Sequence, residues 1–173
     1  MAHKKSYEEE NFVDASKPVW NYSLFNDEQI RNFQNGTNYN LYKYFGSHPL
    51  TVLNKKGYYF AVWAPNATYI SVVGDFNNWD IDQHPLFVRL DKSGIWEGFI
   101  PDIAQFETYK YYIVGFEGAR ILKGDPFARH WELRPKTGSK TKKIEHELSD
   151  LTWMNKRKKD RKSVVQGKSV DIG

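Results

Sequence analysis

Aromatic and β-branched residues recur along residues 57–123 in short runs that turn residues interrupt. The runs 58–63 and 68–74 are the clearest, and the four residues between them contain Pro65 and Asn66. Two apolar runs around a Pro-Asn turn are typical of a β-hairpin. We therefore expect these two runs to pair as neighbouring strands.

The same pattern predicts further strands. Within 109–114, Tyr109, Tyr111 and Ile113 would share one face of a strand, and Lys110 would lie on the other face. No alternation of strands with helices and no internal repeat is present, so short strands at this spacing predict an all-β sandwich. The other expected strands lie near 86–90, 95–100, 107–115 and 119–123, with a weaker one near 141–146.

The residues before this region predict one short helix. Asn26 is a suitable N-cap, Gln29 completes a capping box, and 35–36 (Asn-Gly) supplies a stop. Residues 38–50 are expected to form an irregular segment that docks on the domain through its leucine and aromatic side chains. Residues 1–20 are polar and mixed in charge, and we expect them to be disordered.

The resulting domain division has four parts. A disordered tail (1–20) precedes the helix and docking segment (21–50), the β-sandwich (51–147) and a basic linker (148–173). Within the sandwich, 124–140 is expected to be an ordered loop that Phe127 and Trp131 anchor. Whether Trp131 serves packing or ligand binding is left open at this point.

Composition narrows the class of protein. The chain has 173 residues, enough for one domain, and contains 6 Trp, 11 Tyr and 11 Phe, so some rings should remain on the surface. It has no cysteine, which excludes disulfides and thiol catalysis. The sequence shows no apolar stretch typical of a secretory signal or a membrane span, and we expect a cytoplasmic protein.

The net charge of +4 is concentrated near the end of the sequence. Residues 156–173 contain seven Lys and Arg against two Asp and Glu, which leaves 18 basic and 19 acidic residues in the rest of the chain. A basic run can bind nucleic acid or an anionic membrane, but it is more often a solvated helix or linker. We expect neither nucleic acid nor membrane as a partner.

The sequence lacks a constellation typical of catalysis. The five histidines are widely spaced and form no metal-ligand pair, and no nucleophile elbow or phosphate-binding loop is present. We therefore expect no metal, no cofactor and no catalytic residue within this chain.

The sequence favours a binding surface over a catalytic site. Trp79, at the tip of a loop that follows a strand, could stack on a sugar ring, and Asn77 and Asn78 could hydrogen-bond its hydroxyls. Lys110 could donate to a ligand hydroxyl from the middle of a strand. For each there is a plainer alternative: Trp79 could fold back onto the sandwich edge, the asparagines could only form the turn, and Lys110 could face solvent.

Several collinear motifs resemble those of a known family. The stretch YFAVWAPNATYISVVGDFNNWD (59–80) resembles the glucan-binding module of family 48, which occurs in branching enzymes, debranching enzymes and kinase regulatory subunits. LYKYFGSHPL (41–50) is similar to the first motif of bacterial branching enzymes, with Phe45 and Ser47 departing from it. The resemblance covers about 22–155, and its other motifs are GIWEGFIP (94–101), YKYYIVG (109–115), KGDPFA (123–128) and ELRPKTGS (132–139), the last with Gly138 in place of Ala.

This resemblance implies an immunoglobulin-like sandwich of the early-set type, on the N-terminal side of a 1,4-α-glucan branching enzyme. Such an enzyme forms α-1,6 branches in glycogen with an Asp nucleophile and a Glu acid/base in a downstream (β/α)₈ barrel. The present sequence has no barrel pattern. The expected partners are therefore an α-1,4-glucan and that barrel.

The resemblance also assigns candidate sugar contacts. In the kinase-subunit branch of the family two tryptophans and a lysine hold the sugar; Trp79 matches the first tryptophan and Lys110 the lysine, whereas the second tryptophan aligns near Leu122. The polar loop that completes that site has no clear match among 136–141. We therefore expect weak glucan binding.

Two other functions stay as alternatives. The first is a freestanding glycogen-targeting module, which the segment 41–50 disfavours. The second is a basic interaction domain that uses 156–168 on an anionic partner.

Overall fold

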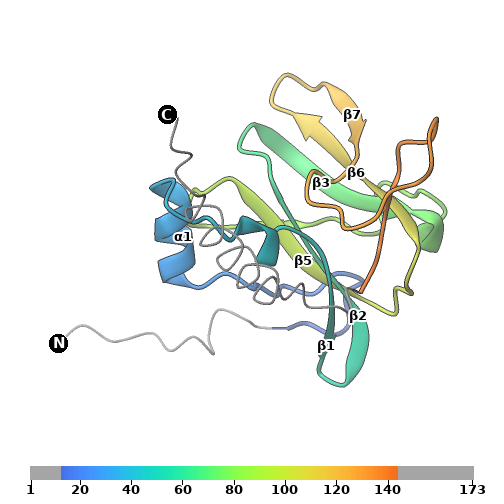
Figure 1. The fold of residues 1–173 in the computed structure, drawn as a ribbon, viewed down its shortest axis with the longest axis horizontal. Coiled ribbons are helices and arrows are strands. Elements are labelled where there is room, and N and C mark those ends of the chain that lie inside the picture. The colour runs from blue at the N-terminus through green and yellow to red at the C-terminus, as the bar shows by residue number, and fades with distance from the viewer. Residues whose placement is uncertain (1–12, 144–173) are drawn as a thin grey trace, which may run out of the picture. The chain divides into compact units, whose positions relative to one another are not determined.

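Two antiparallel sheets form the framework of residues 13–143, the part of the chain that the computed structural model describes (Figure 1). One α-helix, α1 (Asp27–Gln34), and two 3₁₀ turns, η1 (Leu41–Lys43) and η2 (Asp75–Asn77), accompany them. The predicted all-β sandwich is confirmed. In chain order the strands are β1 (Gly46–Val52), β2 (Lys55–Trp63), β3 (Ala67–Gly74), β4 (Phe87–Val88), β5 (Ile95–Pro101), β6 (Thr108–Gly115), β7 (Arg120–Lys123) and β8 (Ser139–Lys140).

The first sheet has the strand order β1-β2-β5-β4, and the second has the order β3-β6-β7, with β8 pairing to β6 beyond the end of β7. All pairs are antiparallel. The strand expected near 141–146 is replaced by β8 at 139–140, and residues 144–146 lie outside the described part. The expected linker 148–173 lies outside it as well.

The predicted hairpin of 58–63 with 68–74 is wrong. β2 pairs with β1 and β5, whereas β3 pairs with β6, so the Pro65-Asn66 turn carries the chain from one sheet to the other. Both arrangements require alternating apolar residues on each strand, because both place one face of each strand in a core. The pattern alone therefore could not distinguish pairing within a sheet from packing between sheets.

The space between the sheets is filled by a first hydrophobic cluster. From the first sheet Phe60 and Val62 point inward, and from the second Ile70, Tyr109 and Tyr111 meet them. These five side chains are almost fully buried. Tyr109 and Tyr111 therefore share one face of β6, as predicted, and this face lies toward the core.

A second hydrophobic cluster lies on the outer face of the first sheet. Tyr59, Phe99 and Ile95 project from the strands, and Trp20 and Ile30 cover them from the N-terminal segment and α1. The helix begins as predicted, because Asn26 Oδ1 accepts from the backbone N–H of Gln29 at 2.9 Å and Gln29 Oε1 accepts from that of Asn26 at 2.8 Å.

Two expected boundaries are corrected. The tail 1–20 was expected to be disordered, but Val19 and Trp20 are buried and Trp20 exchanges two backbone hydrogen bonds with Phe99; residues 1–12 lie outside the described part. The sandwich starts before residue 51, since β1 occupies much of the segment that was expected to be irregular. Pro49 obscured this strand in the sequence, although an edge strand such as β1 tolerates proline.

A buried charged cluster joins the N-terminal segment to the first sheet. Glu97 on β5 accepts from Arg89 Nη1 at 2.6 Å, from Ser23 Oγ at 2.9 Å and from the hydroxyl of Tyr59. Arg89 Nε also donates to Asp91 at 2.7 Å. Burial raises the pKa of Glu97, while Arg89 opposes that rise.

Among residues 13–143, no helix is long and apolar enough to cross a bilayer.

Candidate functional site

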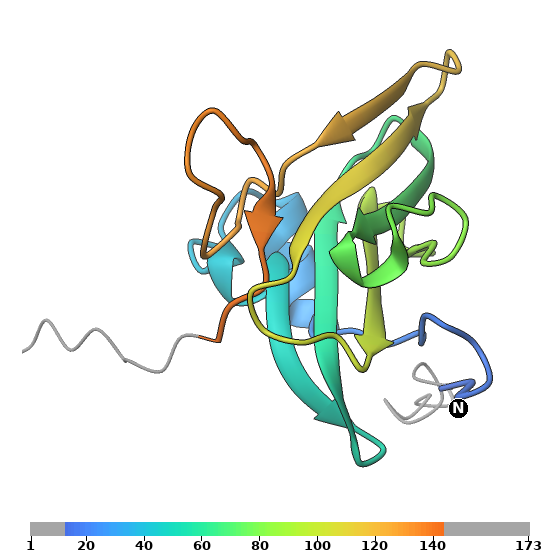
Figure 2. The same ribbon diagram turned by 90° about the vertical axis from the view of Figure 1, so that its right-hand side faces the viewer.

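The outer face of the second sheet differs from that of the first, because no helix of residues 13–143 lies over it. Figure 2 looks onto this sheet, with β6 nearest the viewer, the green segment after β3 on one side and the orange segment after β7 on the other. Lys110 and Tyr112 of β6 point to this face, opposite to the buried Tyr109 and Tyr111. We call it the open face.

Lys110 lies at the middle of the open face. It pairs with Val73 at the end of β3, and its Nζ donates to Oγ1 of Thr137 at 2.8 Å. Its neighbours along β6 pair on the other side with the end of β7 and the start of β8: Tyr111 lies opposite Lys123, and Tyr109 opposite Ser139. The loop 124–138 therefore leaves and rejoins the sheet on either side of Lys110.

The loop that carries Trp79 leaves the sheet at the end of β3, beside Lys110. The backbone N–H of Trp79 donates to the carbonyl of Gly74 at 3.0 Å, and its indole Nε1 donates to Oδ1 of Asp75 at 3.1 Å. Both Asn78 and Trp79 have positive φ angles, which force the chain to turn sharply. The ring is 39% exposed, so it does not fold back into the sandwich edge.

Asn77 has a different position from the one expected. It is 2% exposed; its Oδ1 accepts from the N–H of Gly74 at 2.9 Å, and its Nδ2 donates to the carbonyl of Val72 at 3.0 Å. Its expected role as a ligand contact is corrected, because its polar atoms are already used to hold the loop. Asn78 is exposed and stays a candidate contact.

His84 completes the support of this loop. Its Nδ1 lies 2.9 Å from Nδ2 of Asn77, and because that amide nitrogen can only donate, Nδ1 must accept and carry no proton. Burial lowers the pKa of His84 to about 4, with Asp80 opposing the shift. The loop is therefore built around a neutral histidine.

The loop 124–138 is held from inside the sandwich by Asp125. This fully buried carboxylate accepts from the hydroxyls of Tyr109 at 2.6 Å and Tyr111 at 3.2 Å and from the N–H of Phe127 at 2.8 Å. Burial raises the pKa of Asp125, and the tyrosine hydroxyls oppose the rise. Phe127 stacks on Phe45 at a ring distance of 5.3 Å, which confirms its predicted anchoring role.

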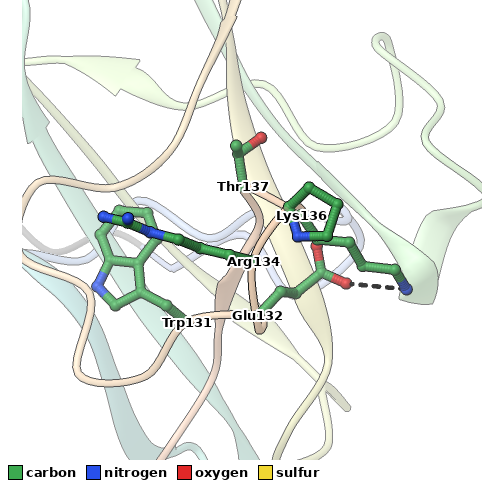
Figure 3. A pocket seen from close by; sticks show the side chains of 6 residues that line it. Trp131, Glu132, Arg134, Lys136 and Thr137 are labelled. Carbon is green, nitrogen blue, oxygen red and sulfur yellow. Dashed lines mark ion pairs between the residues drawn. The ribbon is translucent and has the colours of Figure 1, made fainter.

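A surface pocket lies on this loop beside Lys110. Figure 3 shows Trp131 and Arg134 on one side of it and Lys136, paired with Glu132, on the other; Thr137, the partner of Lys110, lines it too. Glu132 and Lys136 are 3.5 Å apart. Neither the loop's proximity to Lys110 nor the role of Thr137 was predicted, because both depend on strand pairing between distant segments.

The loops beside the open face carry several kinds of polar and aromatic group. They contribute the indole of Trp79, the amide of Asn78 and the hydroxyl of Thr137 near the ammonium of Lys110, and the nearby carboxylates of Asp75 and Glu132 are used in internal contacts. Within residues 13–143, no group of three or more His, Cys, Asp or Glu side chains could hold a metal ion. The arrangement suits a neutral, hydroxyl-rich ligand with an apolar face.

Comparison with known proteins agrees with this chemistry. Residues 44–128 match the model of the family described as carbohydrate-binding module 48 (isoamylase N-terminal domain). This part of the chain belongs to the carbohydrate-binding module 48 family. The matched range runs from just before β1 into the loop after β7, and it includes Trp79 and Lys110.

Curated relatives extend the match. The chain is 46% identical over 131 residues to the 1,4-alpha-glucan branching enzyme GlgB of Oceanobacillus iheyensis, covering 75% of this chain and 20% of that protein. It is 42% identical over 139 residues to GlgB of Bacillus mycoides, covering 79% of this chain and 21% of that protein. The chain thus spans about a fifth of the length of these relatives.

Solved structures are matched at lower similarity. A pullulanase of Klebsiella pneumoniae complexed with maltotriose is 19% identical, with a TM-score of 0.47 over 60% of this chain and 10% of that one.

Proposed function

We propose that this chain is the glucan-binding and structural module of a 1,4-α-glucan branching enzyme that acts in the cytoplasm in glycogen synthesis. The observation that carries the proposal is the similarity to branching enzymes, which reaches 46% identity over three quarters of the chain. No catalysis is expected from this chain. The branching reaction belongs to a catalytic barrel elsewhere in the same enzyme.

The open face supports the binding part of the proposal. The exposed ring of Trp79 can stack against the C–H face of a glucose unit, because the negative face of an indole attracts partially positive hydrogens. Asn78 can bond hydroxyls beside it. Lys110 can donate from the sheet, since its ammonium has three protons and Thr137 uses one.

The module also has a structural role beside the catalytic barrel. It would pack against the barrel and present glucan chains to the barrel's active site, so that the open face influences which chains are transferred. A few sugar contacts of about 1 kcal/mol each give weak affinity, which suits a surface that must release its chain after every transfer.

A chimera tests this function. Residues 13–143 of this chain would replace the matching segment of the Oceanobacillus iheyensis enzyme, and branching of amylose would be followed by loss of iodine colour. We expect an active enzyme, and we expect Trp79→Ala in the chimera to change the lengths of the transferred chains. A folded chimera without branching activity would contradict the proposal and favour a freestanding glycogen-targeting module.

A further inference from the structure

Trp131 is an exposed tryptophan on the other side of Lys110 from Trp79. Its side chain is 44% exposed and belongs to neither hydrophobic cluster. β3 and β7 both run antiparallel to β6, so the loops that follow them leave the sheet in the same direction. The loop with Trp79 and the loop with Trp131 therefore flank Lys110.

The ring of Trp131 is fixed in place although it is exposed. A Cβ atom added at Gly124 would lie 2.7 Å from Cζ3 of Trp131, so the indole rests directly on the backbone there. Trp131 also forms a β-bridge with Ser139, and the next residue, Glu132, donates its N–H to the carbonyl of Gly138 at 2.9 Å. A platform held in this way loses little conformational entropy when a ligand stacks on it.

Two polar groups at this pocket have no internal partner. Within residues 13–143, neither Nε1 of Trp131 nor the guanidinium of Arg134 makes a hydrogen bond or ion pair to another side chain or to the backbone. Both residues line the pocket of Figure 3 together with Thr137. Because Thr137 also accepts from Lys110, the pocket continues directly into the open face.

We propose that Trp131 and Arg134 form a second sugar subsite, which holds a later part of the same α-glucan chain that lies on Trp79 and Lys110. The inference rests on the proposed function and names the additional contact of that site. The indole of Trp131 stacks on a pyranose face, and Arg134 donates to its hydroxyls. The strands that carry the two loops are about 10 Å apart, since one strand lies between them, so only a chain of several units reaches both rings.

Calorimetric titration of the whole chain with maltotriose and with maltoheptaose tests this subsite. We expect Trp131→Ala to weaken maltoheptaose binding about fivefold and to weaken maltotriose binding much less. Only the longer sugar can contact Trp131 and Trp79 at the same time, so only the longer sugar loses a contact that the first site does not replace. Trp131→Phe should recover part of the affinity. Leu133→Ala is the matched control, since this side chain is exposed on the same loop and lies outside the pocket.

An NMR titration of the unaltered chain tests the subsite independently of whether Trp131→Ala folds correctly. The indole N–H resonance of Trp131 should shift on addition of maltoheptaose, with the same saturation as that of Trp79. If maltoheptaose binds Trp131→Ala as tightly as the unaltered chain while Trp79→Ala weakens it, the second subsite is wrong and the proposed function stands. If neither sugar binds the unaltered chain, direct glucan binding by the module fails, and the subsite fails with it.

Discussion

The two sheets carry opposite kinds of outer surface. On the first sheet, Trp20 and α1 cover a cluster of aromatic side chains and a buried carboxylate, Glu97. On the second, β6 lies between two loops on a face that no helix of residues 13–143 covers (Figure 2). Lys110 of β6 lies on this face, and the tryptophans of the two loops are partly exposed. Aromatic residues are thus used in two ways within one domain, for stability on one side and as candidate ligand contacts on the other.

The exposed side chains near the open face are held rigidly by buried residues beneath them. Trp79, Trp131 and Lys110 each make at least one contact that fixes them, yet each keeps surface toward solvent. The residues that hold them, Asn77 and Asp125, are buried. Substitutions on the two sheets should therefore separate stability from sugar affinity.

The largest effect is expected on the covered side. Phe45 is 2% exposed and contacts Phe25, Phe33 and Phe127. Phe45→Ala should lower the free energy of unfolding in urea by about 3–5 kcal/mol, because it leaves a cavity among these rings. The remaining folded protein should lose little affinity for maltoheptaose, because Phe45 acts on the loop 124–138 only through its contact with Phe127. Phe116→Ala, at an 85% exposed position, should change neither quantity.

The next effect concerns the buried charges under the N-terminal segment. Glu97→Ala should destabilise the fold by about 3 kcal/mol, because it leaves the guanidinium of Arg89 buried and without its main partner. Urea unfolding would measure this change. Lys55→Ala breaks the exposed pair with Asp102 and should have no measurable effect. An equal effect of both substitutions would show that burial does not decide the strength of these pairs.

A smaller effect links pH to the loop of Trp79. The pKa of His84 is about 4 in the folded chain, against about 6.5 when it is unfolded, so the folded state binds this proton less tightly. Stability is therefore complete above about pH 6.5 and falls as the pH drops toward 4, by about 1–3 kcal/mol. His48, with a pKa also lowered to about 4, changes stability in the same direction.

NMR can separate the two histidines. The ring resonances of His84 should titrate near pH 4, and the indole resonance of Trp79 should move in the same range, because a charged His84 can no longer accept from Asn77. The variant His48→Gln should leave this titration unchanged. A midpoint near 6.5 for His84 would contradict the buried, neutral state.

The smallest effect is expected on the open face. Trp79→Ala should weaken maltoheptaose binding about fivefold, and Lys110→Met by a similar or smaller factor, with urea stability changed by less than about 0.5 kcal/mol. Calorimetry would measure the affinities. Trp63→Ala is a suitable control, because Trp63 is exposed but packs against Phe33 on the covered side. If Trp79→Ala lowers the free energy of unfolding but leaves the affinity for maltoheptaose unchanged, Trp79 stabilises the fold and does not contact the sugar.

Features that depend on residues close together in the sequence could be predicted from the sequence. The helix start at Asn26 was predicted because a capping box involves residues three apart. The faces of β6 were predicted because alternation is a property of one strand. The position of the Trp79 loop after β3 followed in the same way from the turn residues that end that strand.

Features that depend on pairing between distant segments were not predictable. The partner of β3 is β6 rather than β2, and an alternating pattern fits either choice. Thr137 reaches Lys110 only because β7 and β8 both pair with β6. Asn77 was expected as a sugar contact beside Trp79, with a purely turn-forming role as the alternative. Its bonds to Gly74, Val72 and His84 bury it and leave it that turn-forming role.

The most direct test of the open face as a glucan-binding surface is an NMR titration of the unaltered chain with maltoheptaose, following amide and indole resonances. We predict saturable shifts at Trp79, Lys110 and Asn78, with the resonances around Phe45 and Glu97 unchanged. No shifts at millimolar sugar, or shifts centred on the covered side, would contradict it.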